Sequence, residues 1–390
     1  MNKTLCRGLC LPLLFLFLLS ICGCGTKIQE IQRPAEGEGV VTIAAAGDIY
    51  LTDDMLADAR QPNGSYDFEK QFDSATSAIA KADLAIGNLE GNFVSEGYSE
   101  RNFPVNFAQT LSNVGFDILQ TANTRTIDNG LAGTAYTRSV VESSGMRTLG
   151  VYASRDERED FPALVYDING IRIGFIAFTK GFGGLSLPGD AGYTTNLLYK
   201  DYTTNYEQIN TAAIENAVEE ALRCKPDILI AALHWGSEDT EGSSRSQETI
   251  ADLLFRSGVD IILGSHSHLA GTVEERHLKL EDGTRRDVLL AYSLGDFCAA
   301  ESGYCRLSPV LNIEITRNHA SGTTKITDYG FTAIASVDNG KNELDRYSIM
   351  DADTATALYE NTYYLRIDED LYEKILAKRE DLAEELGLRN

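Results

Sequence analysis

Hydrophobic and polar positions alternate in a regular way along most of the chain. Residues 39–48 are apolar and β-branched, which predicts a buried strand, and an amphipathic pattern over about 68–82 predicts a helix before the strand 82–88. The same alternation recurs with predicted helices at about 107–114, 131–145, 207–223 and 244–257, each followed by a short apolar run. Strands that alternate with helices predict an α/β fold.

The later part of this pattern is richer in strands. Asn169-Gly170 divides a long apolar stretch and predicts a tight hairpin turn. Short strands predicted at 287–297, 307–316 and 325–335 indicate a second sheet, and residues 341–390 resemble capping helices. We therefore expect one domain over 39–340, in which helices cover two central sheets, with 341–390 as part of the same domain.

The first 23 residues differ from this pattern. Lys3 and Arg7 precede an apolar run that ends in Ile21-Cys22-Gly23-Cys24, a segment with the length and flanks of a signal peptide. Its end resembles a bacterial lipobox, with Cys24 as the lipidated residue, and residues 24–38 then form a polar tether. This interpretation predicts an exported protein held by lipid at the extracytoplasmic face of the membrane; a plain secretory signal is the alternative.

Composition narrows the choice of partners. The chain has 34 basic and 58 acidic residues, a net charge of -24, which makes nucleic acid an improbable partner. Four of the seven cysteines lie within the first 24 residues, which leaves Cys224, Cys298 and Cys305 for the body of the protein, too few for a disulfide scaffold. Cys298 and Cys305 could form a bridge or remain thiols, because spacing in sequence does not fix their separation in space.

Side chains that bind metals follow several of the predicted strands. They are Asp48, Glu90, His234, His266 and His268, with Asn88 and Asn123 at neighbouring strand ends. Ligands in open α/β sheets bind beyond the carboxyl ends of strands, so these groups are expected at one edge. Carboxylates together with imidazoles suit Zn, Mn or Fe, and the set could hold one or two divalent ions.

Each of these signals is weak when taken alone. A Gly-Asp pair after a strand is often an ordinary turn or helix cap, and a single buried histidine is usually a hydrogen-bonded core residue. Three of the five histidines, however, fall at two strand ends, and His266 and His268 are only two residues apart. We base the prediction of a metal site on this conjunction.

The order of the motifs resembles the CapA family, which is associated with bacterial capsule and poly-gamma-glutamate synthesis. The matching segments are GDI, NLE, A-N with D-x-G, HWG-x-E, G-x-H-x-H and SLGDF, over about residues 40–300. The resemblance implies a four-layer α/β/β/α sandwich like that of calcineurin-like metallophosphoesterases. It assigns metal ligation to Asp48, Glu90, His234, His266 and His268, and Glu238 and Asp296 also match family positions. Asn88 and Asn123 are expected to support these ligands, and Trp235 is either a packing residue or a support beside His234.

This sequence departs from the family pattern in its third motif. Thr124 stands where the family has an asparagine ligand, and Arg125 stands where it has a histidine; Ser265 also replaces a histidine. Arginine does not donate its proton near neutral pH, but its planar fork can hold a phosphate or carboxylate. These changes allow a reduced metal occupancy. Alternatively, Arg125 has a purely structural role and forms an ion pair with Asp128.

Two functions remain open at this stage. The first is a metal-dependent hydrolase or transferase of the cell envelope, in which Arg125, Asp128 and His234 carry the chemistry. The second is a non-catalytic accessory protein that binds an anionic polymer such as poly-gamma-glutamate, or a membrane synthase, through the same edge. Losing a general acid costs roughly 10²- to 10⁴-fold in rate, so the changes at Thr124 and Arg125 favour the second function without removing the first.

Overall fold

A computed structural model describes residues 37–280, 283–303, 305–340, 346–361 and 367–388. The expected leader, Cys24 and the tether up to residue 36 lie outside these residues, so lipidation and export stay predictions. Within the described residues, no helix has both the length and the apolar character needed to cross a membrane.

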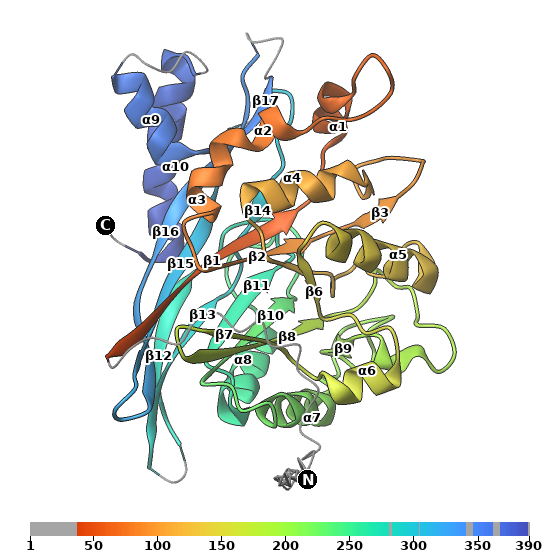
Figure 1. The fold of residues 1–390 in the computed structure, drawn as a ribbon, viewed down its shortest axis with the longest axis vertical. Helices are drawn as coiled ribbons and strands as arrows, with labels where there is room; N and C mark the ends of the chain where they lie inside the picture. Colours follow the sequence, from red (N-terminus) through yellow and green to blue (C-terminus); the bar gives the residue numbers. More distant parts are fainter. Residues whose placement is uncertain (1–36, 281–282, 304, 341–345, 362–366, 389–390) are drawn as a thin grey trace, which may run out of the picture.

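Two large sheets form the centre of the molecule (Figure 1). The first sheet has eight strands in the order β17-β16-β15-β1-β2-β5-β6, with β14 paired to β1. Their bounds are β1 (Glu38–Ile49), β2 (Leu84–Leu89), β5 (Ile118–Gln120), β6 (Arg147–Leu149), β14 (Asp296–Cys298), β15 (Cys305–Asn318), β16 (Thr323–Asp338) and β17 (Tyr347–Asp351).

The second sheet has seven strands in the order β12-β13-β11-β10-β8-β7, with β9 paired to β8. Their bounds are β7 (Leu164–Ile168), β8 (Ile171–Thr179), β9 (Asn196–Leu197), β10 (Ile228–His234), β11 (Ile261–Ser265), β12 (Val273–Lys279) and β13 (Arg285–Ala291). A separate pair joins β3 (Asn92–Val94) to β4 (Asn102–Pro104).

Helices cover the outer face of each sheet. The first sheet carries α1 (Asp53–Ala59), α2 (Glu69–Phe72), η1 (Asp73–Ala75), α3 (Thr76–Ile79), α4 (Asn106–Val114) and α5 (Gly130–Ser143). The second sheet carries α7 (Thr211–Leu222) and α8 (Arg245–Ser257). The remaining helices are α6 (Arg155–Asp160), η2 (Ala191–Tyr193), α9 (Ala352–Glu360) and α10 (Glu369–Leu386). The α9–α10 pair packs against β15 and β16 (Figure 1). The helices α7 and α8 lie on the face of the second sheet that points away from the first sheet.

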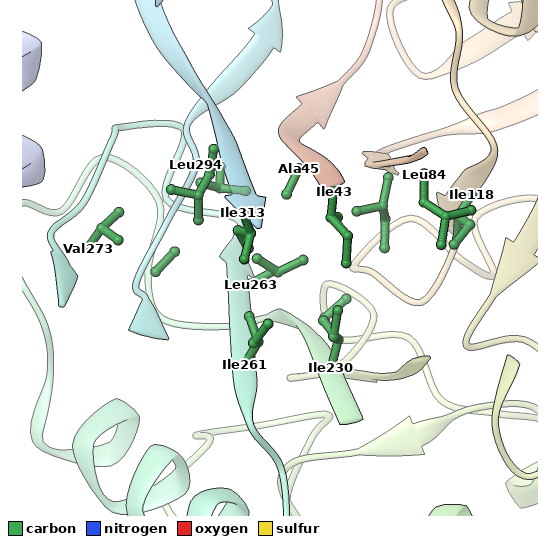
Figure 2. Packing of buried hydrophobic residues seen from close by; sticks show 14 of the residues in the cluster. Ile43, Ala45, Leu84, Ile118, Ile230, Ile261, Leu263, Val273, Leu294 and Ile313 are labelled. Atoms are coloured by element: carbon green, nitrogen blue, oxygen red, sulfur yellow. The ribbon is translucent and has the colours of Figure 1, made fainter. Parts of the chain in front are cut away.

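The strands read as continuous apolar runs because both of their faces are buried. In β1, Ile43 and Ala45 point into the core between the two sheets, whereas Ala44 and Ala46 point toward the helices. Figure 2 shows Ile43 of the first sheet opposite Ile230 and Ile261 of the second. This alternation confirms the two-sheet α/β fold and gives it four layers.

Most predicted elements are confirmed, including the hairpin turn, where Asn169 and Gly170 both have positive φ values of 51° and 74°. The predicted helix over 68–82 is broken into α2, η1 and α3. Residues 341–390 contain the strand β17 as well as helices.

The prediction that the three late strands share a second sheet is wrong for two of them. β15 and β16 extend the first sheet, because β15 pairs antiparallel with β1 from Glu38 to Ala45. β13, which was expected beside them, pairs with β11 in the other sheet. The first sheet therefore combines early and late strands, whereas the second consists of strands between residues 164 and 291. Hydrophobic periodicity does not encode this pairing.

Neither Cys298 nor Cys305 forms a disulfide within the described residues. The Cys298 thiol is buried and donates to the carbonyl oxygen of Tyr50 at 3.0 Å. Of the two alternatives for these cysteines, the structure therefore has the separate thiols.

Candidate metal centre

The strand ends of the two sheets meet at one seam. Asp48 of β1 is in register with Asn88 of β2 on one side and with Asp296 of β14 on the other. In the second sheet, His234 ends β10 and pairs with Ser265, which ends β11. The polar ends of five strands therefore face a common space.

Close backbone approach makes this seam possible. Asp48 donates its backbone N–H to the carbonyl of Gly295 at 2.7 Å. A Cβ atom at Gly47 would lie 1.9 Å from that same carbonyl oxygen, so only glycine fits there. The GDI motif thus needs its glycine for packing and its aspartate for the site.

Glu90, His234 and His266 form the imidazole cluster. All three side chains are buried, and each offers a ligand atom within 4.8 Å of the others. Thr124 lies at its edge, with Oγ1 3.2 Å from His234 Nε2 and 3.4 Å from Glu90 Oε1. The threonine that replaces the family's asparagine thus contacts the cluster but contributes only a hydroxyl.

Asp48, His268 and Asp296 form the carboxylate cluster beside it. His268 Nδ1 lies 2.7 Å from Asp296 Oδ1 and 3.8 Å from Asp48 Oδ2. Its other nitrogen, Nε2, lies 3.9 Å from Glu90 Oε2 and so connects the two clusters. Asp296 is also ion-paired with Arg306. This cluster is therefore already partly neutralised by the protein.

Two buried amides orient these groups. Asn88 Nδ2 donates to Asp48 Oδ1 at 2.6 Å and lies 3.3 Å from His234 Nδ1. Asn123 Nδ2 donates to Asn88 Oδ1 at 3.1 Å, which fixes the first amide. Asn88 and Asn123 therefore hold the ligands of both sheets in place, a role that is typical of the groups around a metal site.

The backbone of the GSHSH segment is unusual. His266 and His268 have φ values of 97° and 61°, in a region that side chains with a Cβ rarely adopt. Asp48 Oδ2 accepts the backbone N–H of His266 at 3.0 Å and helps to hold this conformation. Strained backbone of this kind concentrates at functional sites, because the surrounding structure must compensate for its cost.

Burial shifts the proton affinities of the carboxylates upward. It raises the pKa of Asp48 to about 8, with a further contribution from the negative charge of Glu90. Burial likewise raises the pKa of Glu90. For His268, burial disfavours the charged form, but the hydrogen bond and charge of Asp296 outweigh it and raise the pKa to about 9. The positive charges near the buried carboxylates of Asp48 and Glu90 are thus too few to offset the cost of burying two negative charges.

The two imidazoles of the other cluster shift in the opposite direction. Burial lowers the pKa of His234 well below its usual value, and it lowers the pKa of His266 to about 3. Both rings are therefore neutral at pH 7. A neutral imidazole is the form that binds a metal ion.

These residues fit a divalent metal ion. Glu90 Oε2 and His266 Nδ1 are buried and have no hydrogen-bond partner among the described residues. A buried polar atom without a partner costs roughly 1–3 kcal/mol, and both atoms belong to side chains that ligate metals. The donor set of carboxylate oxygens and imidazole nitrogens suits Zn, Mn or Fe, and two adjacent clusters allow one or two ions.

A small cavity of about 250 Å³ opens beside the imidazole cluster. Arg125 and Lys180 line it together with Glu238 and His266. Lys180 Nζ donates to the carbonyl of Gly236 at 2.5 Å and lies 3.4 Å from His266 Nε2. The two basic side chains on its wall make this cavity suitable for an anionic group.

A larger cavity of about 660 Å³ lies elsewhere, along β6 and β7, the edge strands of the two sheets. None of the cluster residues lines it. The charged groups on its wall include Arg138, which is ion-paired with Glu142 and Glu157. Because chemistry depends on ligand atoms rather than on volume, we place the functional site at the smaller cavity.

Trp235, Glu238 and Asp128 were named from the sequence but belong neither to the clusters nor to the amides that orient them. Successive side chains along an extended chain alternate between faces, so Trp235 points away from His234 into the core on the helix side of the second sheet. There its indole N–H donates to the carbonyl of Tyr292. Glu238 is exposed at the rim of the cavity. Asp128 lies 3.7 Å from Arg125, as the ion-pair alternative expected, although Arg125 also lies 3.9 Å from Glu90.

Sequence reasoning missed Arg101 and Lys180. Arg101 Nη1 lies 3.8 Å from Glu90 Oε2, and its guanidinium carbon lies 4.1 Å from the centre of the Tyr50 ring. It comes from the polar β3–β4 segment, where no periodicity or motif singles it out. Only the fold brings it beside the metal ligands.

Comparison with known families agrees with this site. Residues 42–301 match the family described as bacterial capsule synthesis protein PGA_cap, and this span contains every residue of both clusters. The chain belongs to the PGA_cap family. The resemblance to capsule synthesis proteins that the motifs indicated is thereby confirmed.

Two curated proteins of Bacillus are similar to this PGA_cap chain. It is 23% identical over 307 residues to the capsule biosynthesis protein CapA of Bacillus anthracis, covering 74% of this chain and 66% of that protein. It is 22% identical over 299 residues to the PGA biosynthesis protein CapA of Bacillus subtilis (strain 168), covering 74% and 70%. The match thus spans about two thirds of each relative.

Two solved structures share part of its shape. One is a novel phosphatase from Mycoplasma pneumoniae, with a TM-score of 0.43, 11% identity, and coverage of 76% of this chain and 94% of that one. The other is TT1561 of Thermus thermophilus, with a TM-score of 0.34, 12% identity, and coverage of 75% and 99%. Both likenesses are too weak to carry a conclusion about this PGA_cap chain.

Proposed function

We propose that this PGA_cap chain is a metal-dependent hydrolase or transferase that processes an anionic capsule polymer, such as poly-gamma-glutamate. The observation that carries the proposal is the pair of buried clusters at the seam of the sheets, in which Glu90 Oε2 and His266 Nδ1 lack partners among the described residues. Family membership supports a role in capsule synthesis. The proposed catalytic role rests on the clusters alone.

The residues of the seam divide the work. Asp48, Glu90, His234, His266 and His268 would hold one or two divalent ions, which supply polarisation of a substrate oxygen and a water of lowered pKa. Burial lowers the pKa of His234, so its ring is neutral. Its neighbours Thr124 and Glu90 would keep the ring oriented for ligation.

Arg125 would bind negative charge on the substrate, and Asp128 would orient its guanidinium from 3.7 Å. Lys180 adds a second cation on the wall of the same cavity. Both cations can stabilise a developing negative charge without losing a proton themselves.

A second function is favoured by the third motif. Thr124 supplies a hydroxyl where the family has an amide, and Arg125 cannot act as a proton donor near neutral pH. The same seam would then bind an anionic polymer or an export partner without turnover and with reduced metal occupancy. The cations around the small cavity serve this function equally well.

The proposal includes a location. The lipobox-like segment ending at Cys24 would anchor the protein at the extracytoplasmic face of the membrane, where a membrane synthase would deliver the polymer. Mass spectrometry of the membrane fraction would find a diacylated Cys24. An unmodified chain in the culture medium would contradict the anchor.

Metal content and turnover test the proposed chemistry together. Purified protein should contain one or two equivalents of Zn, Mn or Fe by elemental analysis and should cleave or transfer a γ-linked glutamate oligomer. His266→Ala should lose both metal and turnover, whereas His277→Ala, which changes an exposed histidine, should lose neither. Metal-loaded protein that binds the oligomer but leaves it intact would support the accessory function instead.

A further inference from the structure

We propose that Arg101 and Arg125 together form an oxyanion-binding site beside the metal clusters, with Asn92 as the residue that positions both. The inference builds on the proposed function by naming the chemistry of its ligand, a group with at least two free anionic oxygens. Three observations carry it: donors without acceptors, their common neighbour Glu90, and a shared anchor.

The guanidinium of Arg101 is held in place but is not satisfied. Its Nε and Nη1 atoms are buried and have no hydrogen-bond partner among the described residues, and its side chain is 18% exposed. The carboxylates of Glu90 and Glu100 lie 3.8 and 3.9 Å away, beyond hydrogen-bonding distance. The Tyr50 ring supports the group from below at 4.1 Å.

Arg125 also has a buried N–H donor without an acceptor, and it lies beside the other carboxylate oxygen of Glu90. Its Nε atom is buried, has no hydrogen-bond partner in the described part of the chain, and lies 3.9 Å from Glu90 Oε1. Its side chain is 34% exposed and lines the small cavity. The two guanidinium groups therefore flank one metal-ligating carboxylate, and each retains unused N–H donors.

A single buried residue holds both arginines. The backbone N–H of Asn92 donates to the carbonyl of Arg101 at 2.9 Å. The side-chain Nδ2 of Asn92 donates to the carbonyl of Arg125 at 2.7 Å. Asn92 itself is 1% exposed, so it ties the β3–β4 segment to the third motif at a fixed distance.

Unused charged donors in a buried place indicate a ligand. A buried N–H donor of a charged group that lacks a hydrogen-bond acceptor costs more than the roughly 1–3 kcal/mol of a neutral one. An oxyanion with several free oxygens would accept from both forks at once. Phosphate and carboxylate groups share this chemistry. They are separated by experiment.

Calorimetric titration of the metal-loaded, full-length protein tests the site. Inorganic phosphate and glutarate serve as the probes, one for each source of the oxyanion. Arg101→Gln should weaken binding of the preferred probe by about 10- to 100-fold, and Arg101→Lys should restore it only in part, since an ammonium lacks the planar fork. Arg346→Gln is the matched control, because Arg346 also lies over a tyrosine ring, at 5.0 Å from Tyr347, but belongs to neither cluster.

Asn92→Asp tests the positioning role separately. It removes the donor to Arg125 but keeps the backbone bond to Arg101, so it should weaken the probe less than Arg101→Gln does and leave the metal content unchanged. Binding within twofold of wild type in Arg101→Gln, with unchanged circular dichroism and metal content, would overturn the inference. Wild-type protein that binds neither probe would overturn it as well.

The outcomes for this inference and for the proposed function can be told apart. Wild-type protein that binds a probe through Arg101 but turns over no oligomer would retain the oxyanion site and remove the hydrolase. Turnover together with equal probe binding in wild type and Arg101→Gln would do the reverse. Preference for phosphate or for glutarate then names the kind of ligand that the site takes.

Discussion

Two clusters, each made of two carboxylates and one histidine, lie in opposite environments. Asp48, His268 and Asp296 meet at the seam, whereas Glu275, His277 and Asp287 meet on the β12–β13 hairpin. In each, a histidine Nδ1 contacts an aspartate oxygen, at 2.7 Å in the seam and at 2.8 Å on the hairpin. The two pairs have side-chain exposures of 12% and 0% in the seam but 73% and 60% on the hairpin.

This difference shows that ligand types alone do not make a metal site. On the hairpin, water solvates both carboxylates, so that nothing is gained by replacing water with an ion. At the seam, burial has already removed the water, and the buried negative charge is compensated only in part. We therefore expect the seam cluster to bind a cation more tightly than the hairpin cluster, although each consists of two carboxylates and one histidine.

The largest expected effect is on metal affinity. Asp48→Asn should lower the affinity for the divalent ion by at least about 100-fold, because the ligand loses its charge in a place that water cannot reach. Asp287→Asn, the matched change on the hairpin, should alter it by less than about twofold. Competition with a chelator measures both values, and equal losses would erase the distinction between the two clusters.

The next effect concerns pH and the metal-free protein. The folded pKa values of Asp48 and His268, about 8 and about 9, lie above their ordinary values, so the folded state holds more protons than the unfolded state between pH 7 and pH 9. Stability should therefore fall as pH rises through this window, by on the order of 1–3 kcal/mol.

Urea unfolding at pH 7, 8 and 9 with a chelator present would measure this loss. The Asp48→Asn variant should show a shallower slope, whereas His277→Ala should keep the wild-type slope. Metal affinity should rise over the same window, because binding displaces these protons. Metal-free protein whose stability rises from pH 7 to pH 9 would contradict the cause we assign to the shifts.

A smaller gain is expected from strengthening the seam. Thr124→Asn would place an amide oxygen beside His234 and Glu90, at the position where Thr124 Oγ1 now lies 3.2 and 3.4 Å from them. We expect metal affinity to increase about 10-fold, since one neutral ligand is added to an existing set. Thr204→Asn in an exposed loop is the control, and elemental analysis at limiting metal reports the result.

The smallest effect is on the hairpin itself. His277→Ala removes an exposed pair with Asp287, and such pairs contribute little. The free energy of unfolding should change by less than about 0.5 kcal/mol in thermal or urea unfolding. A larger loss would mean that the exposed cluster has a structural role of its own.

Local features of this site could be predicted from the sequence, because each ligand follows an apolar strand. Strand ends gave Asp48, Glu90, His234 and the two histidines of GSHSH, and parallel pairing brings such ends to one edge. The Asn169-Gly170 turn could also be predicted, because a tight hairpin turn needs two residues that adopt positive φ, and Asn-Gly is a pair that does so.

Other features depend on contacts between distant segments. The pairing of β1 with β15, and thus the composition of each sheet, leaves no periodic signal in either strand. Arg101 lies in a polar segment, and its unsatisfied donors exist only because the β3–β4 pair folds over Glu90. Trp235 was placed near the site by its neighbour His234, although strand alternation sends the two side chains to opposite faces.

The hydrogen bond from His266 to Asp48 joins residues 218 positions apart. Three of the five proposed metal ligands, His234, His266 and His268, are therefore synthesised long after Asp48, and the site cannot form until they are present. We therefore expect metal to bind only after the whole chain has been made. If the chain crosses a membrane unfolded, it would bind its ion in the compartment in which it folds. The metal found in the protein would then show which ions that compartment contains.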